Sequence, residues 1–135
     1  MHRIVFTVVV IFTFIISCNQ SAKTKNNTDP LEAGREFIDA SLKGDYDYAK
    51  QYLLPDSTNL MYFDRFKDFD KNKSEQEKQG YKNANIIINS AENVSDSEMI
   101  INYSNTFKKQ PSKIKLIKKN KEWLVDFKYT FTGNM

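Results

Sequence analysis

Apolar residues between positions 29 and 55 recur at helical spacing, which predicts two helices separated by a glycine. The first helix begins at Asp29, whose carboxylate can cap the free amides, and continues with Pro30, which suits the first helical position. Gly44 ends this helix, because glycine readily adopts the left-handed conformation found beyond helix ends. The second helix begins at Asp45 and ends before Pro55.

A third helix is predicted after Pro55, with Asp56 or Ser57 as its cap. Apolar side chains within residues 60–69 give this helix a broad apolar face. Residues 70–79 contain no large apolar side chain, so they form either a solvated extension of the helix or a mobile loop, which Gly80 closes.

After Gly80 the apolar residues alternate with polar ones, which predicts strands. Four segments show this alternation: residues 84–89, 98–107, 113–116 and 122–131. One apolar face per strand indicates an antiparallel sheet with its other face in solvent, and residues 119–121 have the composition of a hairpin turn. The order of elements predicts an α+β fold, with about three N-terminal helices packed on a four-stranded antiparallel sheet.

The first 18 residues have the pattern of a bacterial lipoprotein signal. Arg3 gives a positive start, and residues 4–16 form an apolar run interrupted only by two threonines. This run is shorter than the roughly 20 residues of a membrane-spanning helix and matches the apolar region of a signal peptide. Ser17 and Cys18 follow branched apolar residues and resemble a lipobox.

The lipobox resemblance implies diacylglyceryl transfer to the Cys18 thiol, cleavage before Cys18 and acylation of the new amine. The alternatives are an uncleaved anchor helix and an ordinary signal peptide with a chance cysteine. We expect a signal peptide over residues 1–17, an acylated cysteine with a flexible polar tether over 18–28, and a single domain over 29–131. The acyl chains would hold this domain on a membrane of the bacterial cell envelope, facing the periplasm.

Two short stretches resemble a known superfamily. Residues 44–50, GDYDYAK, resemble a helix start found in many small secreted domains, and residues 118–127, KKNKEWLVDF, resemble their closing strand. With the lipobox, they make the chain similar to bacterial lipoproteins of the nuclear-transport-factor-two-like superfamily. Within it, the chain resembles a domain-of-unknown-function family formerly labelled lumazine-binding-like. Over residues 29–130 the resemblance implies a cone-like, cystatin-like fold with a curved sheet around the helices, but no particular activity.

The residue types limit the chemistry of the mature chain. His2 is the only histidine and Cys18 the only cysteine. Cleavage of the signal peptide removes His2, and acylation occupies the Cys18 thiol. The mature chain therefore has no nucleophile–histidine pair, and zinc, copper or haem ligation is not expected. Asp64, Asp68 and Asp70 have the spacing of an exposed helix face rather than of a calcium loop. We therefore expect no catalytic residue, no metal and no cofactor.

Acid–base chemistry by carboxylates is the remaining catalytic alternative, because the resemblance includes enzymes that use an aspartate base beside a tyrosine or aspartate donor. The candidate bases are Asp39, Asp64 and Asp126. The candidate donors are Tyr62, Tyr103 and Tyr129. Asp126 falls on the polar phase of its strand, which predicts a side chain that faces solvent.

Aromatic side chains at helical and strand spacing either form the core or line an apolar pocket, and their spacing favours the core. This set comprises Tyr48, Tyr52, Tyr62, Phe63, Phe66, Phe69, Trp123, Phe127 and Phe131. We expect Tyr46 and Phe69 to lie nearest a pocket rim.

Lysines are concentrated near the C-terminus, where residues 101–135 carry eight of them against two acidic residues. The predicted patch for an anionic partner comprises Lys113, Lys115, Lys118, Lys119 and Lys121. Its partner would be an anionic lipid surface, an acidic glycan or an acidic protein, and the alternative is an edge that only prevents strand pairing. Only two arginines, Arg35 and Arg65, remain in the mature chain, so no nucleic-acid partner is expected.

From these features we expect a membrane-anchored, non-enzymatic binding or accessory module of the cell envelope. One alternative is a small-ligand carrier or acid–base enzyme that uses a pocket in the cone. Another is an inhibitor or immunity lipoprotein that acts through the lysine-rich hairpin. A deep pocket with a buried carboxylate beside a tyrosine would favour the first alternative, whereas a pocket filled by aromatic core residues would count against it.

Overall fold

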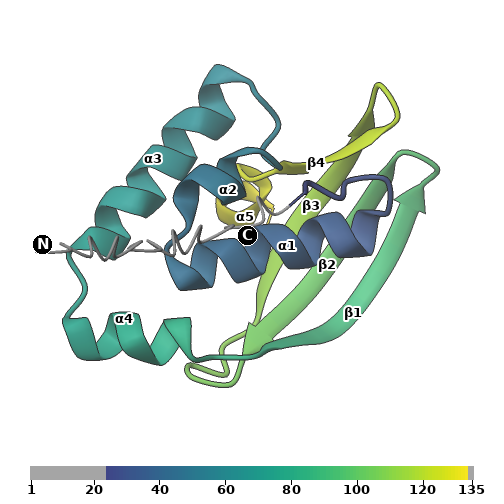
Figure 1. Cartoon of the computed structure of the whole chain (residues 1–135). Coiled ribbons are helices and arrows are strands. Elements are labelled where there is room, and N and C mark those ends of the chain that lie inside the picture. The colour runs from purple at the N-terminus through teal and green to yellow at the C-terminus, as the bar shows by residue number, and fades with distance from the viewer. Residues whose placement is uncertain (1–23, 134–135) are drawn as a thin grey trace, which may run out of the picture.

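The structure, a computed structural model, describes residues 24–133, and Figure 1 shows its helices beside an open, curved sheet. The helices are α1 (Pro30–Lys43), α2 (Tyr46–Lys50), α3 (Ser57–Lys71), α4 (Glu75–Lys82) and α5 (Tyr129–Thr132). The strands are β1 (Ile86–Ser95), β2 (Glu98–Asn105), β3 (Ser112–Lys119) and β4 (Glu122–Asp126). They pair in sequence order, each antiparallel to the next. The predicted α+β class with a four-stranded antiparallel sheet is confirmed.

Capping residues correctly predict the boundaries of α1 and the start of α3. Asp29 accepts a hydrogen bond from the Glu32 amide at the start of α1, and Gly44 ends that helix with a φ of 76°. Asp56 caps α3 in the same way, with its carboxylate on the Asn59 amide. Local side-chain chemistry is therefore enough to place these boundaries.

The prediction that the second helix continues to Pro55 is wrong. Helix α2 ends at Lys50, because the backbone then bonds to β4, where Leu53 forms a β-bridge with Val125.

The prediction that Gly80 closes a polar extension of the third helix is wrong. Ser74 caps a separate helix, α4, and Gly80 lies inside it. A Cβ at Gly80 would lie 2.4 Å from the ring of Phe107, so the glycine makes room for a side chain from the loop after β2. Gly80 therefore has a packing role. A sequence pattern does not distinguish a glycine that packs inside a helix from one that ends a helix.

Two strand boundaries also differ from the prediction. The last strand ends at Asp126, because the backbone amide of Lys128 is bound by Asn59 and the chain then turns into α5. Strand β1 continues to Ser95, beyond the predicted strand over residues 84–89. Its backbone pairs with β2 although its side chains there are exposed and polar, and backbone pairing does not require apolar side chains.

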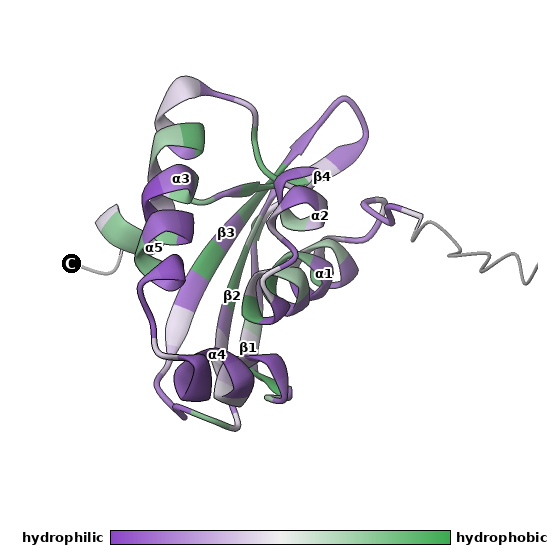
Figure 2. Cartoon of the chain, turned by 60° about the vertical axis from the view of Figure 1, so that its left-hand side comes forward, coloured by the Kyte–Doolittle hydropathy of each residue, from purple (hydrophilic) through white to green (hydrophobic). Residues whose placement is uncertain are grey.

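Helix α1 lies along the sheet and contacts all four strands (Figure 1). Gly34 permits this approach, since a Cβ there would lie 2.5 Å from Ile101 Cδ1. The rings of Phe37, Phe63 and Phe127 contact one another with centroid distances of 5.4 to 5.9 Å, and they join α1, α3 and the end of β4. Figure 2 shows apolar positions on the central strands where the helices face them, whereas α4 is largely hydrophilic.

The chain joins the domain earlier than the predicted start at residue 29. The Trp123 amide donates to the Asn27 carbonyl at 2.8 Å, and the Asn26 amide donates to the Tyr52 hydroxyl at 3.1 Å. Asn27 is buried. The predicted signal peptide and Cys18 lie outside the described residues. Among residues 24–133, no helix is both long enough and apolar enough to cross a membrane.

Candidate functional site

A concave part of the surface lies at one end of the fold, where the C-terminal ends of α1 and α3 meet α4 and the loop between β2 and β3. Two neighbouring cavities of about 250 and 160 Å³ share Leu42, Asp70 and Tyr81 in their walls. The larger one opens between the three helices, and the smaller one extends toward the sheet. We call the two cavities together the end cleft.

Asp70 lies in the wall common to both cavities and has both of its carboxylate oxygens occupied. Tyr46 donates its hydroxyl proton to Oδ2, and the Lys73 ammonium binds Oδ1. The Asp70 and Lys73 side chains are only 16% and 14% exposed, so this ion pair is largely shielded from solvent. The Lys73 Nζ also lies 4.1 Å from the centre of the Tyr81 ring, in a cation–π contact.

The tyrosines of the end cleft remain protonated at neutral pH. Burial raises the pKa of Tyr46 well above its ordinary value, and the hydrogen bond to Asp70 raises it further. Burial also raises the pKa of Tyr103, against the opposing effect of a hydrogen bond with Ser112. The Tyr46 hydroxyl therefore acts as a hydrogen-bond donor, and neither tyrosine supplies a phenolate base.

The smaller cavity is lined in part by polar side chains, and one of their hydroxyl groups has no hydrogen-bond partner in the described part of the chain. Its polar wall residues include Ser41, Tyr103, Asn105, Gln110 and Ser112. The Ser41 Oγ is buried and makes no hydrogen bond with any residue in the described part of the chain. A buried hydroxyl without a partner is destabilising, and Ser41 lies in the wall of this cavity.

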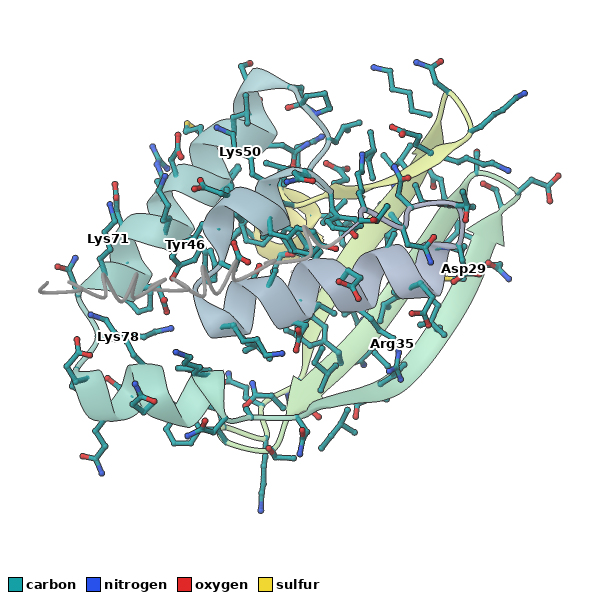
Figure 3. The ribbon with its side chains drawn as sticks, in the orientation of Figure 1. Asp29, Arg35, Tyr46, Lys50, Lys71 and Lys78 are labelled. Atoms are coloured by element: carbon teal, nitrogen blue, oxygen red, sulfur yellow. The ribbon has the colours of Figure 1, made fainter. Side chains whose placement is uncertain are left out.

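The rim of the larger cavity is rich in lysine. Lys43, Lys71, Lys78 and Lys82 line it, against the carboxylates of Asp70 and Glu75. Figure 3 shows Tyr46, Lys71 and Lys78 at this end of the molecule, far from Asp29 at the other end of α1. Three of these lysines are paired with carboxylates, Lys43 with Asp39, Lys71 with Asp68 and Lys78 with Glu75, so little positive charge at the rim is left uncompensated.

The structure does not bring the predicted acid–base residues together. Asp39 is paired with Lys43 at 2.7 Å and Asp64 with Lys67 at 3.4 Å, both on exposed helix faces. Of the predicted donors only Tyr103 lines the end cleft. The other two lie outside it: the ring of Tyr62 stacks on Phe131, and that of Tyr129 lies 5.8 Å from Lys115 Nζ.

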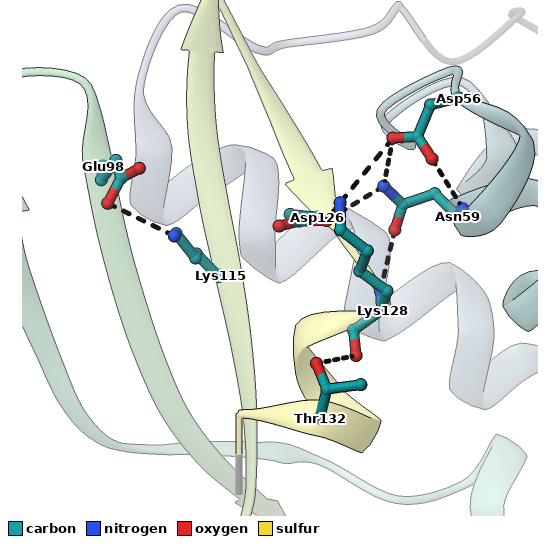
Figure 4. A network of polar contacts seen from close by, with 7 residues as sticks. All are labelled: Asp56, Asn59, Glu98, Lys115, Asp126, Lys128 and Thr132. Carbon is teal, nitrogen blue, oxygen red and sulfur yellow. Dashed lines mark hydrogen bonds and ion pairs between the residues drawn. The ribbon is translucent and has the colours of Figure 1, made fainter.

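The prediction that Asp126 faces solvent is wrong. Its carboxylate is buried and accepts hydrogen bonds from the Asn59 side chain at 3.0 Å and from Lys128 at 2.6 Å. Asn59 also donates to Asp56 and accepts from the Lys128 amide, which completes the network in Figure 4. These groups satisfy one another's hydrogen bonds. The network therefore joins α3 to the end of β4, and its carboxylates are not free to act as a base.

The aromatic residues divide between core and surface. Tyr48, Tyr52, Phe63, Trp123 and Phe127 belong to the buried core, as their spacing favours. Other members of the set, Tyr62, Phe66, Phe69 and Phe131, line a shallow apolar depression of about 230 Å³ beside Arg65. Tyr46 lies at the rim of the end cleft as expected, and Phe69 is 68% exposed just outside it.

The predicted lysine patch is divided by the strand register. Lys113 and Lys115 lie on the sheet face opposite α1, and Lys115 is paired with Glu98 at 3.3 Å. Lys118, Lys119 and Lys121 lie at the turn between β3 and β4, at the far end of the hairpin. By the same alternation Lys119 shares the face of Lys113 and Lys115, whereas Lys118 follows the phase of the buried positions, so the five lysines do not all lie on one face.

Sequence reasoning missed the Asp70–Lys73 pair and its contact with Tyr46. The available signal was the i, i+3 spacing of two opposite charges in a segment without large apolar residues. That spacing is common on exposed helices, and only the fold places α4 and Tyr46 over it. Within residues 24–133, no cluster of three or more histidine, cysteine, aspartate or glutamate side chains is placed to hold a metal ion.

The chain matches no protein-family model, no curated protein and no solved structure.

Proposed function

We propose that this protein is a lipid-anchored module of the bacterial cell envelope that binds a small molecule in its end cleft. The observation that carries the proposal is the buried, unpartnered hydroxyl of Ser41 in the wall of a cavity that also contains the shielded Asp70–Lys73 pair. A cavity with a largely shielded carboxylate beside a tyrosine favours a carrier over a module that acts only through its outer surface.

The lining of the end cleft indicates the chemistry of the ligand. Ser41 and Tyr103 line the smaller cavity, and the rings of Phe66 and Tyr81 form parts of its wall. The rim of the larger cavity adds four lysines, three of them paired with carboxylates. These groups suit a small planar molecule with a carbonyl or carboxylate oxygen, because the ring would contact the aromatic walls and the oxygen would accept hydrogen bonds.

A binding role is favoured over catalysis by the state of the polar groups. Proton abstraction needs a free base within reach of the substrate, whereas Asp70 is occupied by Lys73 and Tyr46. The tyrosines are held in their protonated form. The proposal therefore retains the expectation that the protein is not an enzyme.

The sheet that curves beside α1 in Figure 1 supports the cone-like, cystatin-like architecture of the nuclear-transport-factor-two-like superfamily. We assign the chain to that shape as part of the proposal. The anchor rests on the sequence around Cys18.

Replacement of Cys18 tests the anchor. A Cys18→Ala variant should remain in the aqueous fraction after membrane extraction and should take up no labelled palmitate, whereas the parent chain should partition with membranes and become labelled. If the variant and the parent partition alike and neither is labelled, the anchor is excluded.

Fragment binding tests the end cleft. Benzoate, nicotinate and nicotinamide should shift the amide resonances of α4 and of the loop between β2 and β3 in the full chain. A Ser41→Leu variant, whose larger side chain narrows the smaller cavity, should weaken binding at least tenfold. Ser57 is an exposed serine in the first turn of α3, and Ser57→Leu is the matched control that should bind as the parent does. Equal binding by both variants would disprove the site.

A further inference from the structure

The described chain enters the domain at the turn between β3 and β4. Beyond the backbone bond between Asn27 and Trp123, the Lys25 ammonium lies 3.6 Å from the Glu122 carboxylate. The segment that leads back toward Cys18 therefore starts beside this turn. In Figure 1 residues 24–28 lie next to the ends of the two hairpins.

Positive charge gathers around this point. We call the four lysines there the tip patch: Lys25, Lys118, Lys119 and Lys121. The last three are exposed, and Asn120 and Lys121 adopt left-handed φ values of 51° and 67° that place the turn at the very end of the hairpin. Glu122 pairs with Lys25, and the β1–β2 turn adds Asp96, since the Lys118 amide donates to the Ser97 carbonyl beside it. The next acidic residue, Glu98, pairs with Lys115. Four positive charges against two negative ones leave a net positive tip.

Only a short segment separates the tip patch from the proposed anchor. Thr24 is the first described residue, and 24 − 18 gives six residues to Cys18. Six extended residues span about 20 Å at most. An acylated Cys18 would therefore keep this end of the domain no farther than about 20 Å from the lipid headgroups, and it would allow the lysines to come within one Debye length, about 8 Å, where the charges attract.

The end cleft lies at the opposite end of the same helix. Helix α1 begins at Pro30, beside the segment that enters, and ends at Lys43, which lines the larger cavity. Its 14 residues span about 21 Å. Figure 3 shows this separation between Asp29 at one end and Lys71 and Lys78 at the other.

We infer that the tip patch rests on an anionic membrane surface, so that the end cleft faces away from the membrane. This inference depends on the proposed anchor at Cys18 and adds an orientation and a lipid preference to it. Anionic headgroups are the partner favoured here, because the tether brings them to the lysines, whereas nothing comparable brings an acidic protein.

Lysine footprinting tests the inference on the protein purified from bacterial membranes. Intact mass first shows whether Cys18 carries acyl chains. The acylated protein is placed in phosphatidylcholine vesicles with or without 30 mol% phosphatidylglycerol and treated with an amine-reactive, membrane-impermeant ester. Phosphatidylglycerol should reduce modification of the tip patch at least threefold, leave Lys113 and Lys71 unchanged, and lose this effect in 0.5 M salt.

Matched variants distinguish protection that depends on the lysine charges from protection that depends only on closeness to the membrane. In Lys119→Gln/Lys121→Gln, protection of Lys25 and Lys118 by phosphatidylglycerol should fall to less than half, whereas Lys50→Gln/Lys113→Gln should keep it. If the acylated protein has the same footprint in both kinds of vesicle, the docking is contradicted and the anchor is not. The tip patch would then be a site for an acidic protein instead. A mass without acyl chains would overturn the anchor and the docking together.

Discussion

Asn59 links three separate segments through one buried amide. It is fully buried in the first turn of α3, where its side chain donates to Asp56 and Asp126 and accepts from the backbone amide of Lys128. Each partner is polar, so the loss of Asn59 would leave several groups unsatisfied at once. Asn59 therefore has a structural role, because it connects these segments, and it is not part of the binding surface.

Asn59→Ala should therefore destabilise the fold by about 2 to 4 kcal/mol, because it leaves buried polar groups without partners. Urea unfolding followed by the fluorescence of Trp123 measures this. Asn72→Ala is the matched control, since Asn72 is exposed at the end of α3, and it should change the stability by less than about 0.5 kcal/mol. Similar losses for both variants would contradict the role given to Asn59.

Asp56 gives the same network a pH dependence. Hydrogen bonds from Asn59, led by its backbone amide, and the charge of Lys128 hold the pKa of Asp56 below its ordinary value of 3.8, against the opposing effect of burial. Because the folded pKa lies below the unfolded one, the carboxylate stabilises the fold above about pH 4, and this contribution is lost as the pH falls through the folded pKa.

Asp56→Asn keeps a good capping residue but removes the charge. The variant should have a lower urea midpoint than the parent at pH 7, and the difference should shrink as the pH falls below about 4. Urea titrations at intervals of one pH unit measure it. A difference that is constant across this range would show that the charge of Asp56 does not contribute.

At the scale of elements, α1 depends on a small residue to reach the sheet. A Cβ at Gly34 would lie 2.5 Å from Ile101 Cδ1 and 3.3 Å from Leu116 Cδ1, both in the core. Alanine is the better helix former by about 1 kcal/mol, but the contact with buried side chains outweighs this gain. The sequence places Gly34 inside a helix without a local reason, and the reason is this packing.

Gly34→Ala should destabilise the protein by about 1 to 3 kcal/mol in urea unfolding. Ile101→Val removes the Cδ1 methyl group that the new Cβ would meet, so the double variant should be more stable than Gly34→Ala alone. Arg35→Ala, at the next and exposed position, should be nearly neutral. Failure of Ile101→Val to rescue the glycine variant would show that the cost arises elsewhere.

At the scale of the whole molecule, the two proposed surfaces lie at opposite ends of α1. They share no residue, and the helix between them is about 21 Å long. Sites at such a distance without shared contacts are expected to act independently. The arrangement would leave the end cleft open to solutes while the lipid anchor and the tip patch hold the other end.

Ser41→Leu should therefore leave the lipid-dependent footprint of the tip patch unchanged, and Lys119→Gln/Lys121→Gln should leave benzoate affinity within twofold of the parent. Footprinting and fragment titration on each variant measure both quantities. A change of more than threefold in either cross-measurement would show that the two ends are coupled.

The sequence by itself determined the class of the fold. Apolar spacing separates helices from strands because each element needs one apolar face. Capping residues such as Asp29, Gly44 and Asp56 act within one turn, so they mark helix boundaries without reference to the rest of the chain. The turn at residues 119–121 belongs to the same group, because a short polar connection between two alternating segments suffices to predict it.

Only the tertiary structure decided which polar residues are buried and which of them meet. The alternation along β4 gives Asp126 a polar phase, but it carries no information on Asn59, which lies 67 positions earlier and covers it. Asp70 and Lys73 look like an exposed helical pair until α4 and Tyr46 close over them. Burial of a polar group depends on contacts distant in sequence, and local periodicity does not encode them, so the end cleft emerges only from the folded chain.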